Sequence, residues 1–199
     1  MRRTTRYAAT LAAAALVAGG LVAQNQDAPA ADEMDMDAMM QAYVEAGQPG
    51  EMHELLARMA GEWDVECEFF AEGQTMTSQA TASAEMIMKG RYVQETFSGD
   101  MMGSPFTGMS ITGFDNVSKK VQSTWIDDMS TGVYFMEGNV SPDGKTLTMT
   151  GVASNPMTGG GMPYVHVITF HDDGTHTAEM YEGGDGGLNK NMTLTYTKK

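Results

Sequence analysis

The segment Gly61–Phe70 alternates strictly between apolar and acidic side chains. Its odd-numbered positions from Trp63 to Phe69 are apolar, whereas its even-numbered positions from Glu62 to Glu68 are acidic. A helix would spread these carboxylates around its circumference, but in a strand successive side chains point to opposite faces. The segment therefore predicts the first strand of an antiparallel sheet, with one face on an apolar interior and one face in water.

From Glu62 onward, strand-like runs alternate with turn signals, and no run has the pattern of a helix. Asp143-Gly144 and Asp173-Gly174 supply the positive φ angles that tight hairpins need. Because no crossover helix separates the runs, we expect an all-β fold, an antiparallel up-and-down β-barrel of about ten strands whose closure removes exposed edges. The expected strands are residues 61–70, 75–88, 92–98, 107–114, 121–127, 131–137, 146–151, 164–171, 175–182 and 191–197.

Two short helices are expected before the barrel. Asp37 is a candidate cap for a helix over residues 38–46, which Gly47 would end. A second helix is expected over residues 51–60, where apolar residues recur with helical spacing. Since this helix leads directly into the first strand, we expect it to lie across one end of the barrel.

The N-terminus has the three-part pattern of a secretory signal peptide. A basic start with Arg2, Arg3 and Arg6 precedes an Ala-rich apolar run that ends at Ala23. The run is short for a membrane anchor, so we expect cleavage and no integral membrane domain afterwards. The protein is then exported, to the periplasm or the outside of the cell. The expected division is a signal peptide at 1–23, a linker with a short helix at 24–50 and the barrel domain at 51–199.

Charge limits the partners. Without Arg2, Arg3 and Arg6 the chain keeps nine basic against 26 acidic residues, a formal charge of −17. Such a surface repels phosphate backbones and anionic lipid, so we exclude nucleic acid as a partner. The oligomeric state stays open. Cys67 is the single cysteine, and its place on the apolar face of the first strand favours a buried packing role.

Several motifs in a fixed order over residues 51–199 resemble a known family. They are Leu55-Leu56-x-x-Met59-x-Gly61-Glu62-Trp63, Lys89-Gly90-Arg91-Tyr92-Val93, Gly103-x-Pro105-Phe106-x-Gly108, Gly113-Phe114-Asp115-Asn116 with Lys119-Lys120, Trp125-x-Asp127, Glu179-Met180-Tyr181 and Tyr196-Thr197-Lys198. The chain is similar to the bacterial domain-of-unknown-function family 1579, which is grouped with the calycin-like, lipocalin-type barrels. The resemblance implies the fold and no established activity. Calycin relatives bind small hydrophobic ligands or haem, but this is an analogy of fold, which does not fix function.

The candidate site lies in the expected barrel interior. If Asp173-Gly174 forms a two-residue turn, His166 lies opposite Tyr181 and Glu179 opposite Ile168. An apolar wall with a few polar groups is typical of a small-molecule site, although an ordinary packed core has the same composition. The opposite face of this hairpin is the alternative lining, with Val165, Val167, Ala178 and Met180.

Metal and enzyme chemistry are the alternatives. The chain has 20 methionines, and Met34–Met40 resembles the thioether-rich tracts of exported copper-handling proteins, although methionine also fills cores. The two-residue turn would pair His171 with His176, which lack a third ligand and are better read as a solvated pair. His166 alone could hold haem iron, and His166 with Glu179 could form an acid–base pair.

The sequence thus favours non-covalent binding of a small hydrophobic molecule inside the barrel. The cofactor is left unknown, and no catalytic residue or metal ligand is assigned. The expected ligand contacts are Trp63, Arg91, Trp125, Tyr164, His166, Glu179 and Tyr181.

Overall fold

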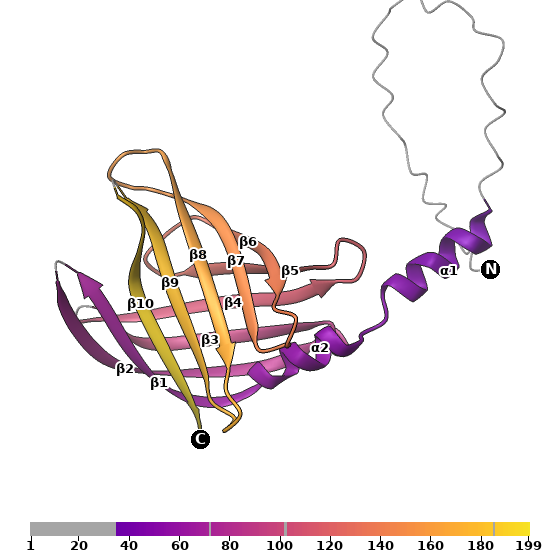
Figure 1. The fold of residues 1–199 in the computed structure, drawn as a ribbon, viewed down its shortest axis with the longest axis horizontal. Helices are drawn as coiled ribbons and strands as arrows, with labels where there is room; N and C mark the ends of the chain where they lie inside the picture. The colour runs from indigo at the N-terminus through magenta and orange to yellow at the C-terminus, as the bar shows by residue number, and fades with distance from the viewer. Residues whose placement is uncertain (1–34, 72, 102, 185) are drawn as a thin grey trace, which may run out of the picture. The chain divides into compact units, whose positions relative to one another are not determined.

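Ten antiparallel strands close into a barrel in the computed structural model, which describes residues 35–71, 73–101, 103–184 and 186–199. Each strand pairs with its neighbours in chain order, and β1 pairs with β10 to complete the ring (Figure 1). The predicted all-β barrel is confirmed. The strands within the described residues are β1 (Gly61–Ala71), β2 (Gln74–Ile87), β3 (Tyr92–Met101), β4 (Ser104–Asp115), β5 (Lys120–Asp127), β6 (Tyr134–Val140), β7 (Thr146–Ser154), β8 (Gly161–Phe170), β9 (His176–Gly184) and β10 (Gly187–Lys198).

The predicted faces of β1 are confirmed. Trp63, Val65 and Cys67 are buried, whereas Asp64 and Glu66 are exposed. The alternation of side chains along a strand thus places the apolar set in the barrel core and the carboxylates in water.

The helices also follow the prediction. Helix α1 (Met36–Ala46) begins two residues before the expected start, and α2 (Glu51–Leu56) continues into a 3₁₀ turn, η1 (Ala57–Met59). Leu56 and Met59 are buried in the barrel core, and α2 lies at one end of the barrel (Figure 1). The N–H of Gly50 donates to Nδ1 of His53 over 3.0 Å at the start of α2, and the indole N–H of Trp63 donates to the carbonyl of Met59 over 2.9 Å.

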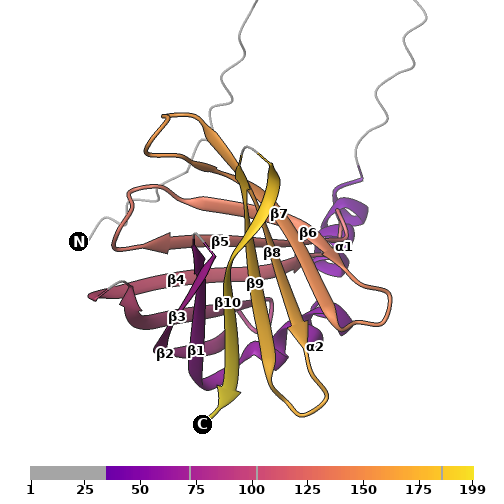
Figure 2. The same cartoon turned by 60° about the vertical axis from the view of Figure 1, so that its left-hand side comes forward.

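The barrel has a closed end and an open end. At the closed end, α2 and η1 lie together with the C-terminus of β10 and the β8–β9 hairpin (Figure 2). The antiparallel order places the β1–β2, β3–β4, β5–β6, β7–β8 and β9–β10 connections together at the other end, which we call the open end.

The β8–β9 turn differs from the prediction by one residue. It has three residues, Asp172–Gly174, because the N–H of His171 donates to the carbonyl of Thr175 over 2.9 Å and Phe170 pairs with His176. Gly174 has a φ of 87°, as the last residue of such a three-residue loop requires. A shift of one residue moves every side chain of a strand to the opposite face.

The predicted pairs across this hairpin are therefore wrong. His166 lies opposite Met180 rather than Tyr181, and Glu179 lies opposite Val167 rather than Ile168. His171 and His176 do not pair. Each of the two predicted linings was right for one strand only: the first for β8 and the alternative for β9. The interior side chains are Tyr164, His166, Ile168 and Phe170 from β8, and His176, Ala178 and Met180 from β9.

Two parts of the expected domain division remain predictions, because residues 1–23 and residues 24–34 of the linker lie outside the described residues. Within the described part of the chain, none of the helices has both the length and the apolar character needed to cross a membrane.

Gly138 offers a test of how closely the strands approach. It lies on β6 opposite Met149 of β7, and a Cβ at this position would come within 1.8 Å of the carbonyl oxygen of Thr148. We expect Gly138→Ala to lower the free energy of unfolding by about 3 kcal/mol, at the upper end for overpacking, because two strand backbones must separate. Urea denaturation followed by tryptophan fluorescence measures this loss.

Gly132→Ala is the matched control, since a Cβ there meets no atom within 4 Å. We expect this variant to stay within about 0.5 kcal/mol of the parent protein. Equal unfolding midpoints for the two variants would contradict the close approach of β6 and β7.

Candidate functional site

A cavity of about 470 Å³ lies inside the barrel. It extends from Met59 of the closed end to residues of the open end such as Asp100, Asp127 and Pro156. All strands except β2 contribute lining side chains, because the inward positions of β2 are occupied by buried alanines. This volume lies within the range of about 300–1,000 Å³ that is usual for small-molecule sites.

Three aromatic rings form one wall of the cavity. Trp125 stacks on Phe106 with ring centres 6.3 Å apart, and Phe97 meets both rings edge-on. The indole N–H of Trp125 donates to a carboxylate oxygen of Asp127 over 3.0 Å, which fixes the ring at the wall. Trp125 therefore presents a flat apolar surface to the cavity.

Tyr164 lies near the open end of the cavity. Its hydroxyl donates to the carbonyl of Phe135 over 3.0 Å, and its ring meets Tyr134 edge-on. Burial, with a smaller contribution from Tyr134, raises the pKa of Tyr164 to about 12. The side chain is thus a neutral, fixed part of the wall.

His166 presents an unpaired nitrogen in the wall. It lines the cavity, and its Nε2 is buried without a hydrogen-bond partner among the described residues. Burial lowers the pKa of His166 to about 4, because the charged imidazolium is poorly solvated there. The imidazole is therefore neutral at neutral pH.

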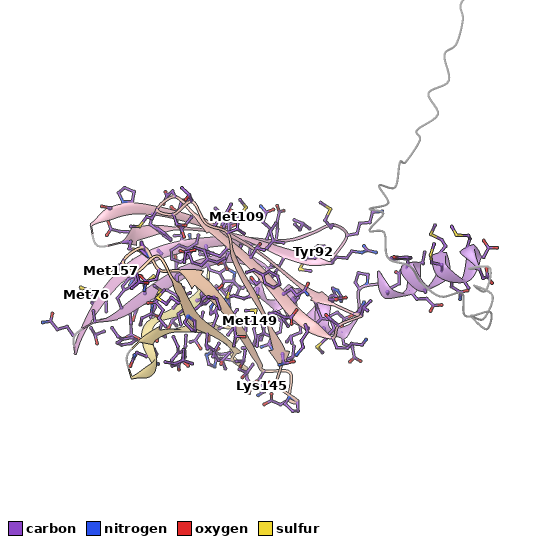
Figure 3. All side chains as sticks on the ribbon, turned by 90° about the horizontal axis from the view of Figure 1, so that it is seen from above. Met76, Tyr92, Met109, Lys145, Met149 and Met157 are labelled. Carbon is purple, nitrogen blue, oxygen red and sulfur yellow. The ribbon has the colours of Figure 1, made fainter. Side chains whose placement is uncertain are left out.

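Methionine is the commonest side chain of the lining. Figure 3 shows Met149 among the strands, apart from Met76 and Met157 at one end of the barrel. The thioethers leave the wall apolar yet polarisable. The methionines of the lining are Met59, Met101, Met129, Met136, Met149, Met162, Met180 and Met192.

The charges around the cavity are all of one sign. The carboxylates of Asp100, Asp127 and Glu182 line its open end. Among the described lining residues there is no lysine or arginine. The lining therefore gives no partner of opposite charge to an anionic ligand.

A buried carboxyl lies beside the cavity. Glu95 of β3 is only 6% exposed, and it faces Ser110 of β4, which lines the cavity. The hydroxyl of Tyr196 donates to Glu95 over 3.4 Å, a long hydrogen bond. Burial raises the pKa of Glu95 to about 7, and the Tyr196 hydrogen bond offsets part of the rise.

Glu95 was not among the expected site residues, although its position in β3 indicates burial. Val93 and Phe97 lie two residues before and after Glu95, so they face the same side of β3, and both are buried. A carboxyl at an inward position of an otherwise apolar alternation indicates a buried acid. Two further inward polar groups, Thr112 and Ser123, form a hydrogen bond of 2.7 Å across β4 and β5.

Trp63 lies at the closed end rather than in the cavity wall. It is fully buried and meets His176 edge-on with ring centres 4.6 Å apart. His176 in turn stacks on Tyr196 at 4.2 Å. Burial lowers the pKa of His176 to about 4, with smaller contributions from His171 and Arg58. These rings seal the barrel beneath the cavity.

Glu179 and Arg91 lie away from the cavity, whereas Tyr181 is one of its lining residues. Glu179 is on the outer face of β9, where it pairs with Lys190 and accepts a hydrogen bond of 3.1 Å from the hydroxyl of Tyr181. The Lys190 hydrogen bond lowers the pKa of Glu179. Tyr181 borders the open end of the cavity, but its hydroxyl is held by Glu179. Arg91 lies in the β2–β3 turn and donates to the carbonyl of Met88 over 3.2 Å.

The proposed acid–base pair is therefore absent. Glu179 and His166 lie on opposite faces of the sheet, because Glu179 pairs outward beside Val167 while His166 points into the cavity. Nε2 of His171 forms a hydrogen bond with the hydroxyl of Thr177 on β9, whereas His176 is buried in the closed end. Within the described residues, no three His, Cys, Asp or Glu side chains are grouped so that they could hold a metal ion.

The similarity to known proteins extends over the whole barrel. Residues 48–198 match the family described as protein of unknown function, DUF1579. The chain belongs to this family. The match includes α2, η1 and all ten strands of the described structure, so the DUF1579 unit is the barrel together with the α2–η1 segment at its closed end. No curated protein matches the chain.

We expect Glu95 to make the stability of this barrel depend on pH. Its folded pKa of about 7 exceeds the ordinary value of 4.5, so the folded protein keeps a proton that the unfolded chain has lost. Stability from this group therefore falls as pH rises from about 4.5 to 7 and is constant above that. We expect Glu95→Gln to gain about 3 kcal/mol over the parent protein across this interval, measured by urea denaturation at each pH.

Glu66→Gln is the control, because Glu66 is an exposed carboxylate of β1. Its unfolding free energy should follow that of the parent protein at every pH. Parallel curves for Glu95→Gln and the parent would show that Glu95 is ionised in the folded state at the same pH as in the unfolded chain.

Proposed function

We propose that the barrel binds a small, largely apolar molecule, neutral or positively charged, without covalent chemistry. The observation that carries this proposal is the cavity of about 470 Å³ with an aromatic and thioether lining and carboxylates at its open end. The closed end is sealed by Trp63, His176 and Tyr196, so the ligand enters between the hairpins of the open end.

The apolar part of the ligand packs against the rings of Phe97, Phe106 and Trp125. These rings are held by one another and by the Trp125–Asp127 hydrogen bond, so the wall is formed before the ligand arrives. A preformed wall reduces the entropy lost on binding. Trp125, Tyr164 and His166 are the proposed contacts among those expected from sequence, with Trp63 beneath them.

Polar recognition is limited to a few groups. Neutral His166 and the hydroxyl of Ser110 line the cavity and can each hydrogen-bond to one polar group of the ligand. A carboxylate ligand would lie buried without a positive partner and near three carboxylates, which is costly. The same carboxylates favour an ammonium group at the open end.

A matched series of twelve-carbon probes tests the proposed ligand class. Dodecanol, dodecylamine and dodecanoate differ only in the head group, and each is used to displace the fluorescent neutral probe N-phenyl-1-naphthylamine. We expect dodecanol and protonated dodecylamine to bind at least tenfold more tightly than dodecanoate. Equal displacement by dodecanoate would contradict the charge argument.

Filling the cavity tests the location. Ala153 is 5% exposed and lines the cavity, whereas its neighbour Val152 is 66% exposed on the outer face of β7. We expect Ala153→Phe to weaken N-phenyl-1-naphthylamine binding at least tenfold and Val152→Phe to change it by less than twofold. Unchanged binding in a folded Ala153→Phe variant would place the probe outside the barrel.

We also propose that the protein is exported, on the basic and apolar pattern of residues 1–23. Cleavage after Ala23 should leave Gln24 as the first residue of the protein isolated from its own cells. N-terminal sequencing of that protein gives the result directly, and a chain that still begins at Met1 would contradict cleavage.

A further inference from the structure

One row of side chains across β7–β10 brings an imidazole and three thioethers together. Met149 of β7 lies directly opposite His166 of β8, and His166 lies directly opposite Met180 of β9. Met180 in turn lies opposite Met192 of β10. All four side chains line the cavity, so the row is a continuous strip of its wall.

The spacing of the row suits a shared ion. Directly opposite residues of antiparallel strands have Cβ atoms about 4.5–5.5 Å apart, so the side chain of His166 starts next to a methionine side chain on each side. The wall of a barrel is concave, which makes inward side chains converge. Methionine side chains are unbranched and turn about three bonds, so Met149 and Met180 can reach a point in front of the imidazole by rotamer changes alone.

The chemistry of the donors selects the ion. Nε2 of His166 is buried and has no hydrogen-bond partner among the described residues, so its donor or acceptor capacity is unused. Thioethers are soft ligands that select Cu(I), and imidazole is also a copper ligand. Zinc sites in proteins are built from cysteine, histidine and carboxylates instead.

We propose that this wall binds one Cu(I) ion through His166, Met149 and Met180, with Met192 as a fourth ligand. Core filling alone accounts for methionines in the interior, but it does not account for a histidine with an unpaired ring nitrogen at the position between two of them. The site shares the cavity with the proposed organic ligand and does not depend on it.

The test is an anaerobic titration of the full chain with Cu(I) in competition with ferrozine, a chromophoric Cu(I) chelator. We expect one equivalent to bind. Met149→Leu and Met180→Leu should each lower the Cu(I) affinity at least tenfold, and His166→Phe at least a hundredfold. Leucine conserves the volume of methionine closely, so the two leucine variants keep the barrel folded even where His166→Phe does not.

Two controls separate this site from other methionines. Met101 lines the same cavity from β3, away from His166, and Met101→Leu should change the affinity by less than twofold. A triple variant of the α1 methionines Met36, Met39 and Met40 to leucine should also be silent. X-ray absorption of the loaded protein should show sulfur and one imidazole around copper.

The proposal is overturned if the chain takes no Cu(I), or if Met149→Leu and Met180→Leu leave the affinity unchanged. Loss of binding in the α1 triple variant alone would assign the ion to that helix instead. Because the titration contains none of the apolar probes, its failure is distinct from a failure of the N-phenyl-1-naphthylamine experiments.

Discussion

The structure depends on the pairing of β1 with β10. Seven residue pairs, from Trp63 with Lys198 to Phe69 with Met192, join the two ends of the sheet and leave no free edge. Once the ring is closed, each strand has a neighbour on both sides, and its register decides which residues face inward. These registers produce the cavity, the packed rings of Trp63, His176 and Tyr196 at the closed end, and the row of thioethers.

The fold could be predicted from local patterns because alternation is a property of each strand alone. Glu62–Phe69 alternates so regularly that burial of Trp63, Val65 and Cys67 follows from the sequence. The Asp-Gly pairs located the turns for the same reason, since only a few residues adopt a positive φ. Neither inference required knowledge of which strand lies next to which.

The site could be predicted only in part, because it depends on register between strands. Asp173-Gly174 is compatible with a turn of two residues or of three, and this choice decides whether Glu179 or Met180 points inward. The side chain of Asp173 supports the longer turn by accepting hydrogen bonds from the N–H and hydroxyl of Thr175 at 2.9 and 2.6 Å. His166 was placed correctly since its own strand alternates, whereas its partners on β9 were not.

Two other differences between the expected and the observed site, at Arg91 and Glu95, do not arise from strand register. Arg91 was expected among the ligand contacts, but it belongs to the β2–β3 turn, where strand alternation does not apply. Glu95 was overlooked because a carboxyl is rarely buried, although its neighbours in the alternation are apolar. For Glu95, the type of residue was given more weight than its position in the pattern.

The carboxylates at the open end also have a kinetic consequence. Asp100, Asp127 and Glu182 line the open end, where the proposed ligand would enter, and the chain as a whole is strongly acidic. Converging negative charge raises the local concentration of cations and speeds their encounter with the opening, while it slows anions. Because the Debye length is about 8 Å at physiological ionic strength, this selection acts over the last few ångströms of approach. If the barrel binds the ligand proposed above, molecules are sorted by charge before any of them reaches the aromatic wall.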